Sequence, residues 1–146
     1  NFKGRDGCRT PMPWTDADDA GFSSGTPWLP IPDAHRRRSV AVQQADPQSV
    51  LASTRRFLHW RRGHAALIAG AQRFIDAPEP LLVFERGDAG SRLLAVFNLS
   101  ATDVAWPLPG HLGAAQALGG HGLVAGTIEE GLVRLPAHAV LFAALD

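Results

Sequence analysis

Residues 92–99 read Arg-Leu-Leu-Ala-Val-Phe-Asn-Leu, and no polar side chain interrupts the run from Leu93 to Phe97. A short apolar run of this kind is typical of a strand that is buried on both faces. The turn-forming stretch Gly-Asp-Ala-Gly at residues 87–90 precedes it. We therefore predict a central strand of a sheet here.

Other short apolar runs lie on both sides of this strand, and residues typical of turns separate them. With it they form the series Leu67–Ile75, Leu81–Arg86, Arg92–Leu99, Asp103–Leu108, Ala114–Leu118, Leu132–Leu135 and Ala139–Leu145. No helical periodicity interrupts the series. Short strands at such spacing predict a mainly β fold, an antiparallel sandwich or barrel.

One helix is expected before the strands. Asp46 followed by Pro47 is a typical N-cap and first helical residue, and Gly63 is a typical C-terminal stop. Apolar residues recur between them at helical spacing. The pattern predicts a helix over residues 47–62 that packs against an apolar surface.

Residues 1–45 form a third kind of segment. They hold five prolines, which exclude a long helix or a central strand, together with Trp14, Trp28 and two phenylalanines. A disordered linker would not carry so many aromatic side chains. We expect a long ordered loop whose aromatic residues are mostly anchors, with sugar stacking by the tryptophans as the alternative.

Composition excludes several classes of protein. The 146 residues are 45% hydrophobic and carry no formal net charge, so no long-range field attracts nucleic acid or an anionic membrane. No apolar run approaches the roughly 20 residues of a membrane span. The single cysteine, Cys8, excludes an intrachain disulfide. The absence of an initiator methionine leads us to expect a piece of a longer protein.

Motifs for cofactors and metals are also missing. The sequence has no phosphate-binding loop and no nucleophile elbow. Asp16 and Asp18 suggest a calcium loop, but Ala20 and Pro27 stand where further ligands belong. The run His-Arg-Arg-Arg at residues 35–38 is interpreted as a solvated loop face. We expect no metal, no cofactor and no nucleic-acid partner.

The most specific pattern lies near the start of the chain. Residues 4–14 read GRDGCRTPMPW, followed by AGF at residues 20–22 and PWL at residues 27–29. This series resembles the signature R-D-x-x-R-T-P-M-Q-W, A-G-F, P-W of the α-glucosidase branch of glycoside hydrolase family 13. Pro13 departs from it, because glutamine is common at that position.

The resemblance implies a fold and a division of the chain. Residues 1–65 would be the end of a catalytic (β/α)₈ barrel, namely its eighth βα loop and last helix. Residues 66–146 would be the β-sandwich that follows the barrel in this family. Active sites of such barrels lie on the face that carries the βα loops.

The resemblance also implies roles for four residues. Arg5 would bind the terminal glucose at the closed end of the pocket, because a planar guanidinium can bond two vicinal hydroxyls. Asp6, Arg9 and Trp14 would be structural residues of the same loop, the two charged ones acting through ion pairs and backbone hydrogen bonds. A simpler interpretation of Arg5 is an ion pair with Asp6 or another loop acid.

The implied activity is hydrolysis of terminal α-linked glucose from short oligosaccharides by a retaining, exo-acting enzyme, in the cytoplasm or periplasm of a bacterium. Its catalytic carboxylates would lie upstream, since no matching motif occurs here, and this chain alone would be inactive. A trehalose synthase, sucrose isomerase or glycosyl-transferring relative is one alternative. A stand-alone carbohydrate-binding sandwich is the other.

Overall fold

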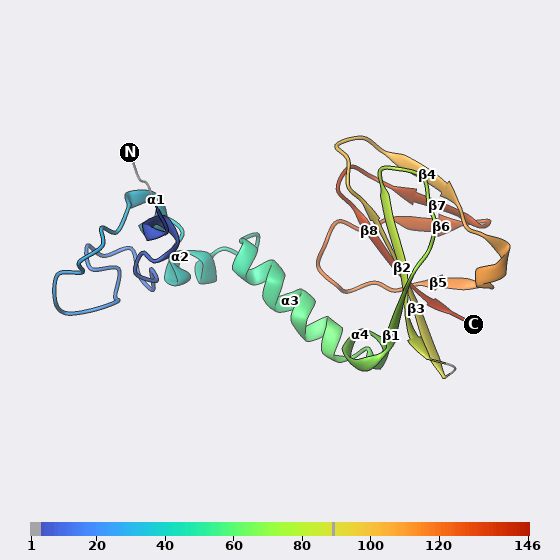
Figure 1. The fold of residues 1–146 in the computed structure, drawn as a ribbon, viewed down its shortest axis with the longest axis horizontal. Coiled ribbons are helices and arrows are strands. Elements are labelled where there is room, and N and C mark those ends of the chain that lie inside the picture. Colours follow the sequence, from blue (N-terminus) through green and yellow to red (C-terminus); the bar gives the residue numbers. More distant parts are fainter. Residues whose placement is uncertain (1–3, 89) are drawn as a thin grey trace. The chain divides into compact units, whose positions relative to one another are not determined.

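The computed structural model of the chain describes residues 4–88 and 90–146. It contains two compact units, Asn1–Arg55 and Arg56–Asp146. Helix α3 (Val50–Arg62) begins in the first unit and ends in the second (Figure 1). In the described ranges no helix is long and apolar enough to cross a membrane.

The first unit consists of irregular backbone and short helices. Its elements are the 3₁₀ turn η1 (Asp6–Cys8), α1 (Asp33–Arg36), α2 (Val40–Ala45) and the start of α3. Ser39 is the N-cap of α2, and its hydroxyl accepts a hydrogen bond from the Val42 amide at 3.5 Å. The short helices are compatible with the prolines, because the five prolines of residues 1–45 precede α1 and Pro47 lies between α2 and α3.

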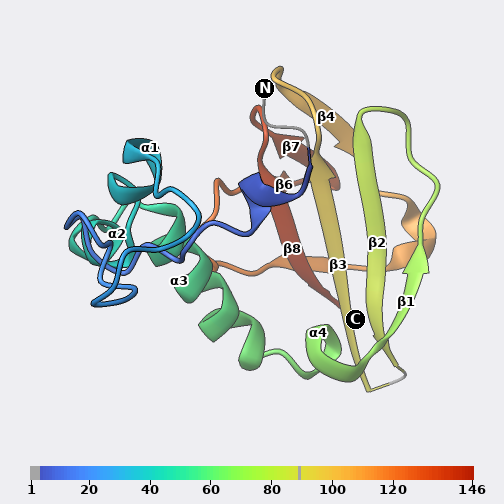
Figure 2. The ribbon, with the colours of Figure 1, turned by 60° about the vertical axis from the view of Figure 1, so that its left-hand side comes forward.

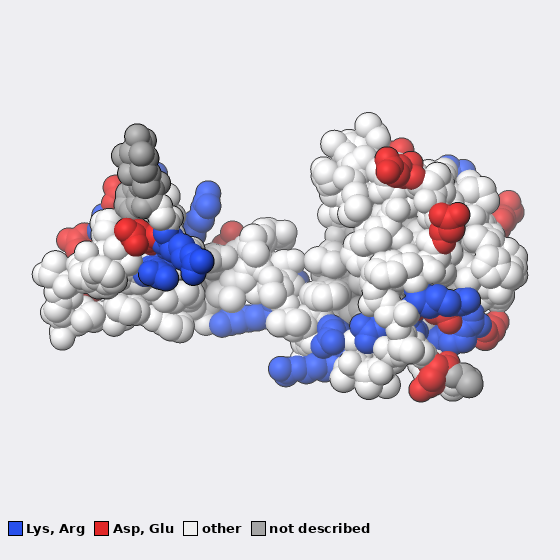
Figure 3. Space-filling model, in the orientation of Figure 1, with Lys and Arg blue, Asp and Glu red and all other residues white. Residues whose placement is uncertain are grey.

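Helix α3 starts later than predicted. It begins at Val50, and the predicted cap Asp46 instead accepts a hydrogen bond from the Gln48 amide in the preceding turn at 2.8 Å. Ser49 provides the cap, because its hydroxyl accepts from the Ala52 amide at 3.2 Å. The helix ends at Arg62, as predicted. Basic side chains follow its surface in Figure 3.

The second unit is an antiparallel sandwich of two sheets (Figures 1 and 2). The larger sheet contains, in spatial order, β1 (Ala71–Phe74), β2 (Leu81–Asp88), β3 (Ser91–Asn98), β8 (Val140–Leu145) and β5 (Ala115–Ala117). The smaller sheet contains β4 (Val104–Pro107), β7 (Leu132–Leu135) and β6 (Thr127–Glu129). A 3₁₀ turn, η2 (Gly110–Leu112), precedes β5.

Two parts of the predicted strand series were wrong. The run Leu67–Ile75 is not one strand, because helix α4 (Ala65–Ala69) occupies its start and β1 only its end. Ala66 and Leu67 of α4 are buried against the larger sheet, and that packing favours a helical turn. Strand β6 was not predicted, because Ile128 is its single apolar residue.

The predicted central strand is confirmed. From Leu93 to Val96 the side chains of β3 are at most 3% exposed. Leu94 and Val96 point into the core between the two sheets, whereas Leu93 and Ala95 pack on the other face, which α4 covers (Figure 2). Burial on both faces explains the absence of polar alternation in this stretch.

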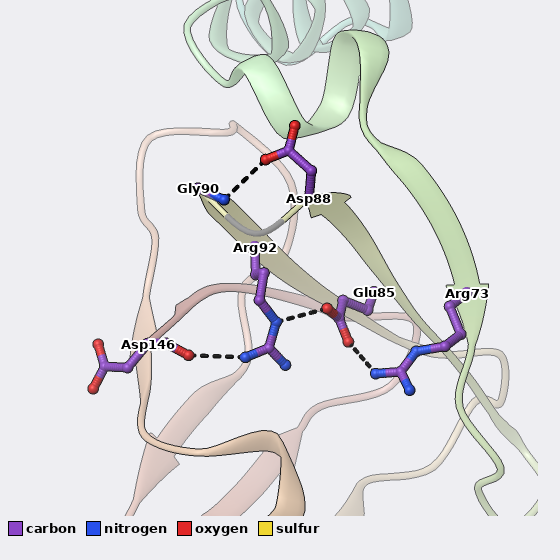
Figure 4. Close-up of polar contacts among 6 residues, drawn as sticks. All are labelled: Arg73, Glu85, Asp88, Gly90, Arg92 and Asp146. Carbon is purple, nitrogen blue, oxygen red and sulfur yellow. Dashed lines mark hydrogen bonds and ion pairs between the residues drawn. The ribbon is translucent and has the colours of Figure 1, made fainter.

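Two polar clusters complete the sandwich. Glu85 of β2 binds Arg73 of β1 at 2.6 Å and Arg92 of β3 at 2.7 Å, while Arg92 donates to the Asp146 carbonyl oxygen (Figure 4). Asn98 is 3% exposed, and its amide donates to the carbonyl oxygens of Thr102 and Pro136. Both hydrogens of that amide are therefore used within the protein, so the Asn98 side chain is a structural group of the sandwich.

Candidate functional site

Arg5 stands at the start of a tight turn. Its carbonyl oxygen accepts hydrogen bonds from the Cys8 amide at 3.2 Å and the Cys8 thiol at 2.9 Å. The Arg9 amide donates to the Asp6 carbonyl oxygen at 3.0 Å, which closes η1. The Arg5 side chain is exposed. Backbone bonds thus hold the turn, and among residues 4–88 and 90–146 the guanidinium makes no hydrogen bond or ion pair.

The predicted ion pairs of this turn have no counterpart in the described part of the chain. The four ion pairs found there join Arg36 to Asp18, Arg36 to Asp33, Arg73 to Glu85 and Arg92 to Glu85. Arg5, Asp6 and Arg9 are in none of them. The structure brings these three residues together through the backbone of η1.

Trp14 lies in a second turn that backbone bonds connect to α2. Its amide and that of Thr15 both donate to the Ala20 carbonyl oxygen, at 2.8 and 3.0 Å. The Trp14 carbonyl oxygen accepts from the Ala41 amide at 3.0 Å. Ala20 itself is fully buried and has a φ of 54°, a conformation that is uncommon for a residue other than glycine. The A-G-F part of the motif therefore marks a constrained turn.

Large aromatic side chains of the first unit are exposed to solvent. Trp14 and Phe22 are each 51% exposed, and Trp28 is 88% exposed. Within this unit Trp28 does not act as a buried anchor. Exposed indole rings offer flat apolar faces on which a sugar ring can stack.

Sequence reasoning missed the part played by Arg36. Its guanidinium pairs with Asp18 and Asp33, and so joins α1 to the turn after Trp14. The hydrogen bond from Arg36 lowers the pKa of Asp33. The spacing of three residues between Asp33 and Arg36 was a usable signal, because such residues are neighbours on a helix surface.

The described residues contain no group of three or more His, Cys, Asp or Glu side chains that could hold a metal ion. The acids of the region that suggested a calcium loop serve other purposes. Asp18 pairs with Arg36, and Asp19 accepts a hydrogen bond from the Gly21 amide at 2.9 Å.

Residues 1–70 match the α-amylase catalytic-domain family. Over 145 residues the chain is 44% identical to a probable alpha-glucosidase of Rhizobium meliloti, an alignment that covers 99% of this chain and 26% of that protein. The chain thus spans about a quarter of the length of that relative.

Solved structures give the same result. The alpha-glucosyl transfer enzyme XgtA is 48% identical with a TM-score of 0.89, over 99% of this chain and 27% of the enzyme. The trehalulose synthase MutB of Pseudomonas mesoacidophila MX-45 is 27% identical with a TM-score of 0.79, over 98% of this chain and 26% of the synthase. The likeness covers both the motif turns and the sandwich.

Proposed function

The chain belongs to the α-amylase family, glycoside hydrolase family 13, and on that basis we propose that it is the C-terminal part of a retaining, exo-acting α-glucosidase. The parent enzyme would hydrolyse terminal α-linked glucose from short oligosaccharides. The observation that carries this proposal is the agreement along the whole chain with a probable α-glucosidase, the motif turn of Arg5 included.

The division of labour follows from chemistry. Retaining glycosidases use two carboxyl groups about 5 Å apart, one as nucleophile and one as general acid and base. We place both in the preceding barrel of the parent, with residues 1–65 as the barrel's last loop and helix and residues 66–146 as the sandwich. The chain alone would then be inactive, because it lacks both groups.

Arg5 would act on the substrate by binding. Its guanidinium is exposed, has no ion pair among the described residues, and sits on a turn that backbone bonds hold in shape. A planar fork of this kind can donate two parallel hydrogen bonds to vicinal hydroxyls of the terminal glucose. Such bonds orient the sugar and contribute transition-state binding rather than bond chemistry. Asp6, Arg9 and Trp14 would maintain the loop.

The test is Arg5→Ala in the full-length parent, with Arg38→Ala as the matched control. Arg38 is also an exposed arginine of the first unit. We expect Arg5→Ala to lower kcat/KM for maltose by roughly tenfold or more, the loss of a charged hydrogen bond, and Arg38→Ala to leave it unchanged. If Arg5→Ala changed kcat/KM for maltose by less than twofold, Arg5 would have no role in binding the terminal glucose. Hydrolysis of p-nitrophenyl α-glucoside by the isolated chain would show that catalytic groups lie within it.

A second candidate function is glucosyl transfer or sucrose isomerisation. The likeness to XgtA and MutB favours it, because those proteins are described as a glucosyl transfer enzyme and a trehalulose synthase. Incubation of the parent with maltose and with sucrose separates the candidates. Hydrolysis yields only monosaccharides, whereas transfer or isomerisation yields new disaccharides or longer products.

A further inference from the structure

Helix α1 is linked to the loop that follows η1 by two consecutive side chains. This loop comprises residues 10–18. The Nδ1 atom of His35 lies 3.2 Å from the Oγ1 atom of Thr10, and the guanidinium of Arg36 forms an ion pair with Asp18. The two contacts join residues that are 25 and 18 positions apart in the chain. One helical turn therefore holds the loop at its start and at its end.

The guanidinium of Arg36 meets two carboxylates that belong to different segments. One of its terminal nitrogens donates to Asp18, and the other donates to Asp33 within α1 itself. Its planar fork makes both bonds possible at once. The side chain of Arg36 is 25% exposed, whereas that of Asp18 is fully exposed. Removal of the Asp18 carboxylate would therefore break the link to the loop without disturbing buried packing.

Backbone hydrogen bonds connect the same loop to α2. The Val40 amide donates to the Pro13 carbonyl oxygen, and the Ala41 amide donates to the Trp14 carbonyl oxygen, both at 3.0 Å. The two acceptors lie between the side-chain contacts made by α1. The loop is therefore held along its length rather than at a single point.

The start of this loop is continuous with the turn that carries Arg5. Thr10 directly follows Arg9, whose amide closes η1 on the Asp6 carbonyl oxygen at 3.0 Å. The Cys8 amide donates to the Arg5 carbonyl oxygen at 3.2 Å. Because these bonds make η1 one short closed turn, the placement of Thr10 determines where Arg5 lies.

We propose that α1 holds the turn of Arg5 in place, and that Arg36 and His35 are positioning residues for the binding of glucose. The inference rests on the proposed role of Arg5 and adds to it the part of the chain that fixes where its guanidinium lies. The two residues act through the loop rather than on the substrate. A shift of about 1 Å in a group that orients a substrate can cost roughly a hundredfold in rate, so a modest loosening of this link has a measurable effect.

Hydrogen exchange in the full-length parent tests whether α1 supports the turn. The amides of Cys8 and Arg9 close η1, so exchange is followed by mass spectrometry in a peptide that contains both. Thr10→Val and Asp18→Ala are combined in a paired variant, which removes both side-chain contacts. We expect exchange to be roughly fivefold or more faster than in the wild type, the combined value of an exposed ion pair and a neutral hydrogen bond. The matched control Asp33→Ala removes the carboxylate within α1 and should exchange at the wild-type rate.

Kinetics of the parent on maltose test whether this support matters for substrate binding. The paired variant should lower kcat/KM roughly fivefold or more, but change it by less than twofold when Arg5→Ala is also present. A variant that merely folds less well would lose activity equally in both backgrounds. Asp18→Ala alone should lower kcat/KM, whereas Asp18→Glu keeps a carboxylate for Arg36 and should retain it.

Unchanged exchange in the paired variant would overturn the proposal, because η1 would then be held by other contacts. Equal losses of kcat/KM in the two backgrounds would also overturn it, because α1 would then not act through Arg5. If exchange accelerates in the paired variant while Arg5→Ala leaves kcat/KM unchanged, α1 supports the turn but the pocket role of Arg5 fails. The two failures are thus distinguishable.

Discussion

The indole nitrogen of Trp60 donates a hydrogen bond to the carbonyl oxygen of Gly119 at 2.8 Å, and so joins the last turns of α3 to the loop after β5. The ring also packs on Phe142 and on His64, with centroids 4.9 and 4.1 Å away. One side chain therefore connects the helix, the loop and the larger sheet through both polar and apolar contacts.

Trp60→Phe should lower the free energy of unfolding by about 1 kcal/mol, the net value of one hydrogen bond, because the ring packing is largely kept. Trp60→Ala removes the packing as well and should cost about 3 kcal/mol. Urea unfolding of the chain measures both. Leu58→Ala, at a half-exposed position of the same helix, is the control and should change stability by less than about 0.5 kcal/mol. Equal losses for Phe and Ala would show that packing contributes nothing.

Glu85 should make the sandwich less stable in acid. The hydrogen bond from Arg92, with a smaller one from Arg73, lowers the pKa of Glu85 below its ordinary value of 4.5. Its contribution is complete above that value and is lost as the pH falls from there through the folded pKa. Glu85→Gln should unfold more easily at neutral pH, by about 1–2 kcal/mol, and lose less stability on acidification than the wild type.

The control for this experiment is Glu129→Gln, at an exposed glutamate of β6. Unfolding free energies are compared between about pH 6 and pH 3, the range around ordinary carboxyl pKa values. If the unfolding free energies of Glu85→Gln and the wild type decreased in parallel over this pH range, that result would contradict the assigned ion pairs.

His121 should make the stability of the sandwich depend on pH in a higher range than Glu85 does. It is 2% exposed, its ring contacts Trp60 and Phe142, and burial lowers its pKa from the ordinary value of 6.5. A lowered histidine pKa means that the unfolded chain binds the proton more readily. The stability contribution is therefore complete above 6.5 and is lost as the pH falls below it towards the folded pKa.

His121→Phe should remove this loss, so that its unfolding free energy varies less than that of the wild type between about pH 7.5 and pH 5, the range in which histidines titrate. The exposed His111 provides the matched control His111→Phe, which should retain the wild-type slope. A wild-type slope in His121→Phe would mean that another group carries the effect.

Gly87 should tolerate no side chain. Its φ is 139°, and a Cβ atom there would lie 2.0 Å from the Ser91 carbonyl oxygen, within the β2–β3 pair. Gly87→Ala should cost about 3 kcal/mol or more, because both strain and a backbone clash must be relieved. A Cβ at Gly110 meets nothing within 4 Å, so Gly110→Ala should change the midpoint of thermal unfolding by a few degrees at most. Similar midpoints for the two variants would exclude the clash.

Much of the sandwich was predictable because its signals are local. The apolar run of β3 needed only its own residues, and the turns on either side gave approximate bounds for β2 and β8. Strand β6 precedes β7 by a two-residue turn, in which Glu130 and Gly131 both have positive φ. Its pattern was missed because three residues are too few to show alternation.

The candidate site was less predictable. The residue types around Arg5 indicated a family and a pocket role, but the use of Arg36 to join α1 to the turn at Asp18 depends on a fold that brings residues 18 apart in sequence into contact. No spacing rule gives such a pair, because its geometry is set by every turn between the two residues.

The sequence by itself determined the β character of the chain, the position of its central strand, the end of α3 and the family motif, because periodicity, turn chemistry and motif spacing act over a few residues. Only the tertiary structure decided that residues 65–69 are helical, since that choice depends on burial of Ala66 and Leu67 against β3. It also decided which phenylalanines of the larger sheet stay open. Burial depends on partners that lie far away along the chain, and no local pattern encodes them.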